Sequence, residues 1–194
     1  MKDFEYPDGA TPLDPDEIDG LKLKHITTRG ELDRWEQENI QDALAWLDRR
    51  RKSDILNEEF ICQLHEKMFG KVWKWAGEFR RTNKNIGVEW TAISVELRQL
   101  LDDVKYWIEK EVYPKNEIAY RLHHKLVWIH LFPNGNGRHS RMTADVLTEA
   151  FGLEAFTWGS GNLTDASVTR KQYINALKAA DHQDYSLLKA FVSS

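Results

Sequence analysis

The residues best suited to do chemistry lie in one stretch of twelve, His130-Leu131-Phe132-Pro133-Asn134-Gly135-Asn136-Gly137-Arg138-His139-Ser140-Arg141. A histidine at the C-terminal end of one predicted helix is followed by a tight turn and then by the start of another helix. The two glycines leave backbone N–H groups unobstructed, and the start of the second helix adds further N–H donors and a favourable dipole. The stretch therefore predicts an anion-binding turn between two helices.

Arg138 and Arg141 are three residues apart in the first turn of the second helix, so we expect both to point to one side. Two guanidinium groups beside a cluster of N–H donors favour a polyphosphate over a lone carboxylate. His130, at the edge of the turn, is the nearby group that can take up a proton near neutral pH. Each residue alone is explained by an ordinary helix–turn–helix connection, and their coincidence within twelve residues favours a reactive phosphate site.

The elements that must position this stretch are helices, because apolar residues recur every three or four positions through most of the chain. Residues 77–93 break this rhythm and indicate a β-hairpin or two short extended arms. Residues 158–167 are rich in Gly, Ser and Asn and indicate a loop. The predicted fold class is mostly α with one small hairpin. The expected helices cover about 28–51, 57–70, 94–113, 116–132, 137–151, 169 onward and 184–192.

Composition narrows the function classes. The 194 residues carry a net charge of −4, which argues against broad nucleic-acid binding, and no direct nucleic-acid partner is expected. The single cysteine excludes an internal disulfide, and the longest apolar run is far too short to cross a membrane. The N-terminus lacks the features of a signal peptide, so a cytoplasmic protein is expected. Residues 1–20 hold seven acidic residues and three prolines and are expected to form an extended, solvated arm.

The stretch resembles the Fic-domain signature His-x-Phe-x-(Asp/Glu)-Gly-Asn-Gly-Arg-x-x-Arg. Asn134 departs from it, since the family usually has Asp or Glu there. Segments 64–70, 75–80 and 173–177 also look like Fic sequences, so the resemblance covers about 57–192. Asn134 and the segment 19–32 look like the Fic proteins called mobile mystery protein B. The matching positions are His130, Phe132, Gly135, Asn136, Gly137, Arg138 and Arg141.

The resemblance implies a Fic-like helical bundle with a β-hairpin flap, in which an N-terminal arm and helix (1–56) pack on a catalytic domain (57–194). It implies protein adenylylation, in which AMP moves from ATP to a Ser, Thr or Tyr hydroxyl of a target protein. His130 would be the base, with Asn136 and Arg138 as further catalytic residues. Those implied to bind the nucleotide are Gly135, Asn136, Gly137, Arg138 and Arg141.

The same resemblance implies roles around the site. Asn134 stands at the family's metal position, with Mg²⁺ held mainly through the nucleotide phosphates. The target would dock by strand addition on the flap, which consists of Thr82, Asn83, Lys84, Asn85, Ile86, Gly87 and Val88.

Two further features concern regulation and function class. Fic proteins are often restrained by a helix whose Glu blocks the second motif arginine, and Glu31 matches that pattern in part, although a helix-capping box with Thr28 explains it equally. A toxin-like enzyme with an antitoxin-like partner is one interpretation. Transfer of another phosphate-containing group, and a weakly active or non-catalytic relative that binds a nucleotide or a partner, stay open.

Overall fold

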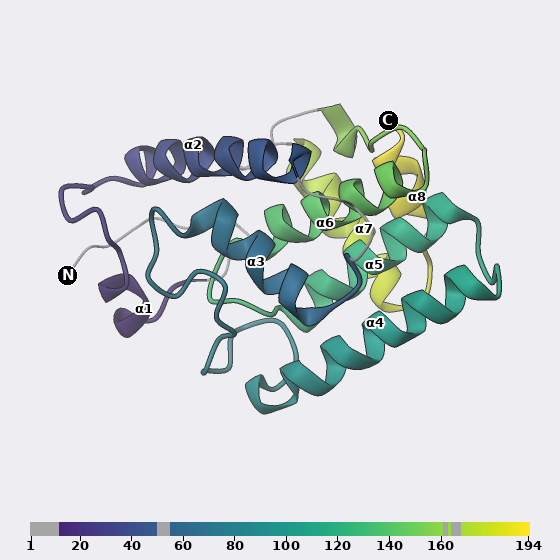
Figure 1. Cartoon of the computed structure of the whole chain (residues 1–194), viewed down its shortest axis with the longest axis horizontal. Coiled ribbons are helices and arrows are strands. Elements are labelled where there is room, and N and C mark those ends of the chain that lie inside the picture. Colours follow the sequence, from purple (N-terminus) through teal and green to yellow (C-terminus); the bar gives the residue numbers. More distant parts are fainter. Residues whose placement is uncertain (1–11, 50–54, 161–162, 164–167) are drawn as a thin grey trace.

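The computed structural model describes residues 12–49, 55–160, 163 and 168–194, and these are mostly helical (Figure 1). Eight α-helices and two short 3₁₀ turns are found in this part of the chain, in the order α1 (Pro15–Asp19), α2 (Arg29–Asp48), α3 (Glu58–Phe69), η1 (Trp90–Ala92), α4 (Ile93–Glu109), α5 (Lys115–Ile129), α6 (Asn136–Ala150), η2 (Trp158–Ser160), α7 (Val168–Asp181) and α8 (Ser186–Val192).

Helices α5 and α6 form the centre of the bundle and pack against each other along their length. Helix α4 lies beside α5, α3 touches α6, and α2 packs on α3 along one edge of the molecule (Figure 1). The main apolar core is built from α2 to α6, and a second cluster joins α7 and α8 to the other side of α5 and α6. The connection between α5 and α6 is therefore held from several sides.

The helices expected from apolar spacing are confirmed to within a few residues in the described parts of the chain. The expected extended arm is wrong for its C-terminal part, because residues 15–19 form α1, and Leu13 and Leu21 on either side of it are buried. Residues 1–11 of the expected arm, and residues 161–162 and 164–167 of the expected loop, lie outside the described residues.

The expected β-hairpin is not confirmed: residues 77–89 form a loop, and no strand is assigned anywhere in the described residues. One backbone N–H group in each arm of this loop bonds to the end of α5 or to the residues that follow it. The Arg80 N–H donates to the Leu131 carbonyl at 3.0 Å, and the Val88 N–H donates to the Ile129 carbonyl at 3.4 Å. Since these donors are already used, a ladder between the arms does not form at these two positions.

Candidate functional site

The α5–α6 connection turns through two residues in the left-handed region. His130, at the end of α5, has φ 59° and ψ 65°, and Gly135, just before α6, has φ 80°. A Cβ atom at Gly135 would lie 2.6 Å from the Phe69 ring, so only glycine fits this position. The turn thus connects His130, at the end of α5, to the start of α6.

Asn136 closes this turn from inside. Its Oδ1 accepts the Phe132 N–H at 2.9 Å, and its Nδ2 donates to the Phe132 carbonyl at 2.7 Å. The side chain is almost fully buried, so its amide shapes the loop, and the part of Asn136 left to hold a phosphate is its backbone N–H. The backbone N–H groups of residues 136–138 open α6 and, as in every helix, have no partner within it.

His65 of α3 holds the turn through hydrogen bonds and ring stacking, a role that the sequence did not indicate. Its Nε2–H donates to the Asn134 carbonyl at 3.0 Å, and its Nδ1 accepts the Gly77 N–H at 2.9 Å. Its ring stacks on the buried Phe132 ring with centroids 3.7 Å apart. Complete burial holds the pKa of His65 well below its ordinary value, which keeps the ring in the neutral form that these bonds require.

His130 itself is 5% exposed, and burial lowers its pKa to about 4, with the nearby Arg80 guanidinium as a smaller cause. The imidazole is therefore neutral at pH 7 and able to accept a proton. The backbone of Val127 hydrogen bonds with this ring and partly offsets the shift. The residue predicted to be the base is thus in the required protonation state.

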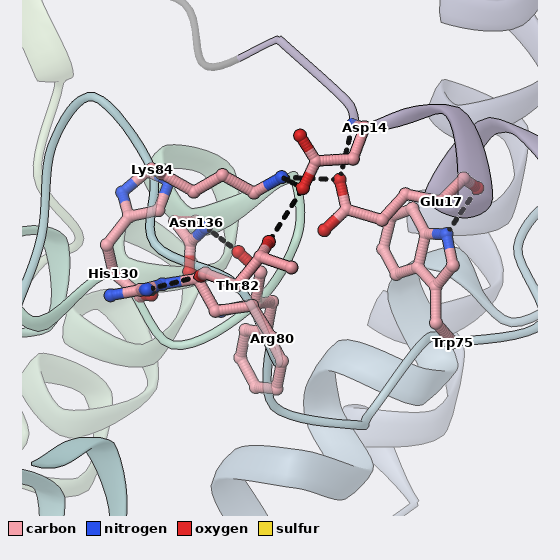
Figure 2. Close-up of polar contacts among 9 residues, drawn as sticks. Asp14, Glu17, Trp75, Arg80, Thr82, Lys84, His130 and Asn136 are labelled. Carbon is pink, nitrogen blue, oxygen red and sulfur yellow. Dashed lines mark hydrogen bonds and ion pairs between the residues drawn. The ribbon is translucent and has the colours of Figure 1, made fainter. Parts of the chain in front are cut away.

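Arg80 is a site residue that the sequence analysis missed. Its buried guanidinium donates to the His130 carbonyl at 2.6 Å and to the Thr82 carbonyl at 2.8 Å (Figure 2). It also donates to the Val88 carbonyl. It therefore joins the end of α5 to both arms of the 77–89 loop. Its sequence signal was its place in the expected hairpin stretch 77–93 and at the end of the Fic-like segment 75–80.

The two motif arginines meet different neighbours. Arg138 Nη2 forms an ion pair with Glu36 Oε2 of α2 at 2.7 Å, and Glu36 is almost fully buried. The other oxygen of Glu36 accepts the Trp73 Nε1–H at 2.6 Å. Arg141 lies over the Tyr173 ring of α7, 5.4 Å from its centroid. Arg138 is thus in contact with α2, and Arg141 with α7.

Glu31 forms the capping box and does not act on the motif in this structure. Its Oε2 accepts the Thr27 and Thr28 N–H groups at 2.9 and 3.1 Å, while its own N–H donates to Thr28 Oγ1 at 3.3 Å. These hydrogen bonds lower the pKa of the exposed Glu31 carboxyl. The acidic residue of α2 that does reach a motif arginine is Glu36, five residues further along, which the sequence analysis did not single out.

The implied metal position does not fit a resident Mg²⁺. Mg²⁺ in proteins is usually held by one or two carboxylates plus substrate phosphates, and Asn134 offers an uncharged amide oxygen. That oxygen accepts the Gly135 N–H at 2.6 Å. No group of three or more His, Cys, Asp or Glu suited to a metal occurs in the part of the chain that the structure describes.

The described residues contain no helix that is both long and apolar enough to cross a membrane.

Fold and site together define a helical domain with a His-containing, glycine-rich turn between its two central helices. The Fic/DOC family model matches residues 55–148, and this part of the chain belongs to the Fic/DOC family.

Similar proteins agree with this assignment. A protein adenylyltransferase Fic of Drosophila grimshawi is 30% identical over 138 residues, which are 69% of this chain and 27% of that protein. The relative of the same name from Aedes aegypti is 31% identical over 100 residues, or 50% of this chain and 20% of that protein. The chain spans about a quarter of the length of the curated relatives it matches.

Solved structures share the fold. The N-terminal Fic domain of Bep8 from Bartonella sp. 1-1C has a TM-score of 0.67 at 16% identity, with 89% of both chains covered. Fic-1 (residues 134–508) from C. elegans has a TM-score of 0.61 at 22% identity, with 79% of this chain and 46% of that chain covered. An N-terminal Fic domain of a Bartonella quintana effector, with bound ADP, has a TM-score of 0.67 at 15% identity, with 91% of this chain and 93% of that chain covered.

Proposed function

We propose that this protein transfers AMP from ATP to a hydroxyl side chain of a target protein, with His130 as the general base. The observation that carries the proposal is a neutral histidine placed beside a turn that opens α6, with Arg138 and Arg141 in the first turn of that helix. The name of the relatives, protein adenylyltransferase, supports ATP as the donor.

In the proposed reaction a ring nitrogen of His130 accepts the hydroxyl proton as the target oxygen forms a bond to the α-phosphorus. The bond from that phosphorus to the bridging oxygen breaks, and pyrophosphate leaves with its electron pair. The N–H groups that open α6 and the guanidinium groups of Arg138 and Arg141 stabilise the charge on the phosphates. The His130 proton then passes to solvent. Any Mg²⁺ enters with the nucleotide phosphates, because Asn134 brings no charge to hold it.

The 82–88 loop is the proposed docking segment for the target. It lies over the His130 end of α5, and its residues Asn83, Asn85 and Ile86 are exposed. A partner protein of the antitoxin kind is also part of this proposal. The segment 1–56 is proposed to pack on the catalytic part as a support, through α1 and α2.

The test is incubation with labelled ATP, Mg²⁺ or Mn²⁺ and a bacterial lysate, followed by mass analysis of protein adducts. His130→Asn should lower transfer by roughly 10²- to 10⁴-fold while it still binds ATP, because it removes the proton acceptor. Asn suits this position because it tolerates the left-handed backbone. The control is His182→Asn, an exposed histidine outside the site. Equal transfer by the His130 variant and the parent would refute the mechanism.

A non-catalytic nucleotide-binding function is the second candidate. It is favoured by Asn134, because an uncharged amide stands where the family usually has a carboxylate, and Mg²⁺ beside the phosphates is then held less firmly. In that case the protein should bind ATP by calorimetric titration but produce no adduct in the lysate assay.

A further inference from the structure

Lys84, in the middle of the 82–88 loop, is tied to the N-terminal helix α1. Its side chain is 3% exposed, and its Nζ lies 2.8 Å from Asp14 Oδ2 and 2.5 Å from Glu17 Oε2. Thr82 Oγ1 also donates to Asp14 Oδ2, at 2.6 Å (Figure 2). Two residues of the loop are therefore held by two carboxylates that lie more than 60 residues earlier in the chain. We refer to Asp14, Glu17 and Lys84 as the latch.

The α1 side of the latch is fixed to the body of the protein. The Trp75 Nε1–H donates to the Glu17 carbonyl at 2.9 Å. The Lys74 N–H donates to the Gly20 carbonyl at 2.9 Å, and the Lys22 N–H donates to the Val72 carbonyl at 2.8 Å. Helix α1 is short, but these bonds give it a defined place from which its carboxylates can hold the loop.

The other side of the loop rests on His130. Gly87 has φ 98°, and a Cβ atom there would lie 2.6 Å from the His130 Cβ and 3.1 Å from the Ile129 carbonyl oxygen. The loop is thus packed between α1 and the predicted base. The contacts that set the position of the loop therefore also set which part of a bound target His130 can contact.

The charges of the latch decide whether this closed position is favourable. A buried ammonium group loses its hydration, and opposite charges with good geometry must compensate for that loss. Asp14 and Glu17 supply two such charges, and hydrogen bonds from Lys84 first and Thr82 second hold the pKa of Asp14 below its ordinary value. Without them the closed loop would bury an uncompensated charge, and the loop would be expected to leave His130 so that Lys84 could reach water.

We propose that Asp14 and Glu17 are positioning residues: by pairing with Lys84 they hold the 82–88 loop closed on His130, and so fix where a target segment lies relative to the base. The role of the latch in transfer rests on the proposed function. The closed loop itself is a property of the fold that is measured separately.

The test uses the full chain with Asp14→Asn and Glu17→Gln combined. Asn is a good N-cap and Gln can replace Glu in a capping box, so α1 keeps its local bonds and loses only its charges. Addition of Lys84→Met to this pair removes the buried charge and leaves an apolar side chain of similar length, which can stay buried. The matched control is Asp42→Asn, which breaks the exposed Lys71–Asp42 pair of 2.7 Å on another surface.

Three readouts are compared: amide hydrogen exchange of the 80–88 segment, affinity for the ATP analogue AMPPNP, and labelling of lysate proteins from ATP. In the charge-neutralised double variant we expect exchange of the segment to become at least tenfold faster and transfer to fall at least tenfold, with AMPPNP affinity within twofold of the parent. The triple variant should return exchange and transfer toward the parent, and Asp42→Asn should change neither. Recovery on removal of a third charge identifies the buried lysine as the cause, which general damage to α1 would not produce.

Unchanged exchange in the double variant, or a triple variant as fast in exchange as the double, would overturn the latch. Faster exchange with parental transfer would overturn the positioning role and leave a purely structural contact. If the parent itself transfers nothing, the proposed function and the positioning role fail together, while exchange still decides whether the latch closes the loop.

Discussion

Glu36→Gln should strengthen nucleotide binding, because it removes a negative charge from a motif arginine. Glu36 is almost fully buried and forms an ion pair with Arg138 at 2.7 Å, and its other oxygen accepts the Trp73 Nε1–H at 2.6 Å. A phosphate that approaches the free side of the Arg138 guanidinium therefore meets a fixed carboxylate behind it. Glutamine keeps an acceptor for Trp73 and has the same shape without the charge.

The size of the effect follows from Coulomb's law. A phosphate charge and a carboxylate on opposite sides of one guanidinium are ~6 Å apart, which gives a repulsion of about 3 kcal/mol at an effective dielectric constant of 20. Part of this gain is lost because Arg138 is less firmly held once its carboxylate is gone. We expect a net gain of about 1–2 kcal/mol, or roughly 5- to 30-fold tighter binding. The free energy of unfolding should fall by about 1–3 kcal/mol, since Arg138 is partly exposed and can reach water.

The assay is calorimetric titration of parent and variant with ATP at one ionic strength, combined with urea unfolding of the same samples. The control is Glu31→Gln on the same helix, where the capping box is retained and no motif arginine is touched. A folded Glu36→Gln variant with unchanged or weaker affinity would refute the reasoning. A gain for Glu31→Gln of the same size would show that the effect comes from the overall charge of α2 and not from the Arg138 contact.

Three further predictions concern pH, metal dependence and the loop. Burial lowers the pKa of His130 and His139 to about 4, so as the pH falls below about 6.5 these histidines are protonated in the unfolded chain before they are protonated in the folded protein. The free energy of unfolding from urea titrations should therefore be about 2 kcal/mol per histidine lower at pH 5 than at pH 8. A free energy of unfolding that does not change with pH would contradict this. Asn134→Asp should weaken ATP binding without Mg²⁺ and lower the metal concentration that transfer requires, as measured by titration with and without Mg²⁺. An unchanged metal dependence would show that Asn134 does not occupy the metal position. Gly87→Ala should lower the free energy of unfolding by about 1–2 kcal/mol and lower transfer, because the new Cβ meets His130. In the control Gly152→Ala, φ is 72° and the added Cβ meets nothing, so thermal unfolding should show only the backbone strain of about 1 kcal/mol. Parental transfer by Gly87→Ala would contradict the close contact.

The helices and the turn at 130–137 could be predicted because both depend on local features. Apolar spacing of three and four residues is a property of each segment alone, and a glycine before a helix start indicates the turn that Gly135 makes. The capping box at Thr28 and Glu31 is local as well, and the structure confirms it.

The contacts that distinguish this site could not be predicted, because they join residues far apart in the sequence. The Glu36–Arg138 pair spans about 100 residues, and the latch about 70. The hairpin is not confirmed for a related reason. Residues 77–93 do lack helical periodicity, but the backbone bonds that a strand pair would use at Arg80 and Val88 go to the α5–α6 connection, which no local pattern indicates.

The sequence boundary of the family match has a consequence for how this domain can be divided. The match begins at residue 55, yet the carboxylates that neutralise Lys84 and Arg138 come from residues 14, 17 and 36. A fragment cut at that boundary would keep the buried Lys84 ammonium and the partly exposed Arg138 guanidinium but lose the carboxylates that pair with them, and burial makes this loss costly for Lys84. The smallest unit of this chain that can be expected to fold as described therefore includes α1 and α2, because their carboxylates balance these cations, although the family match does not extend to them.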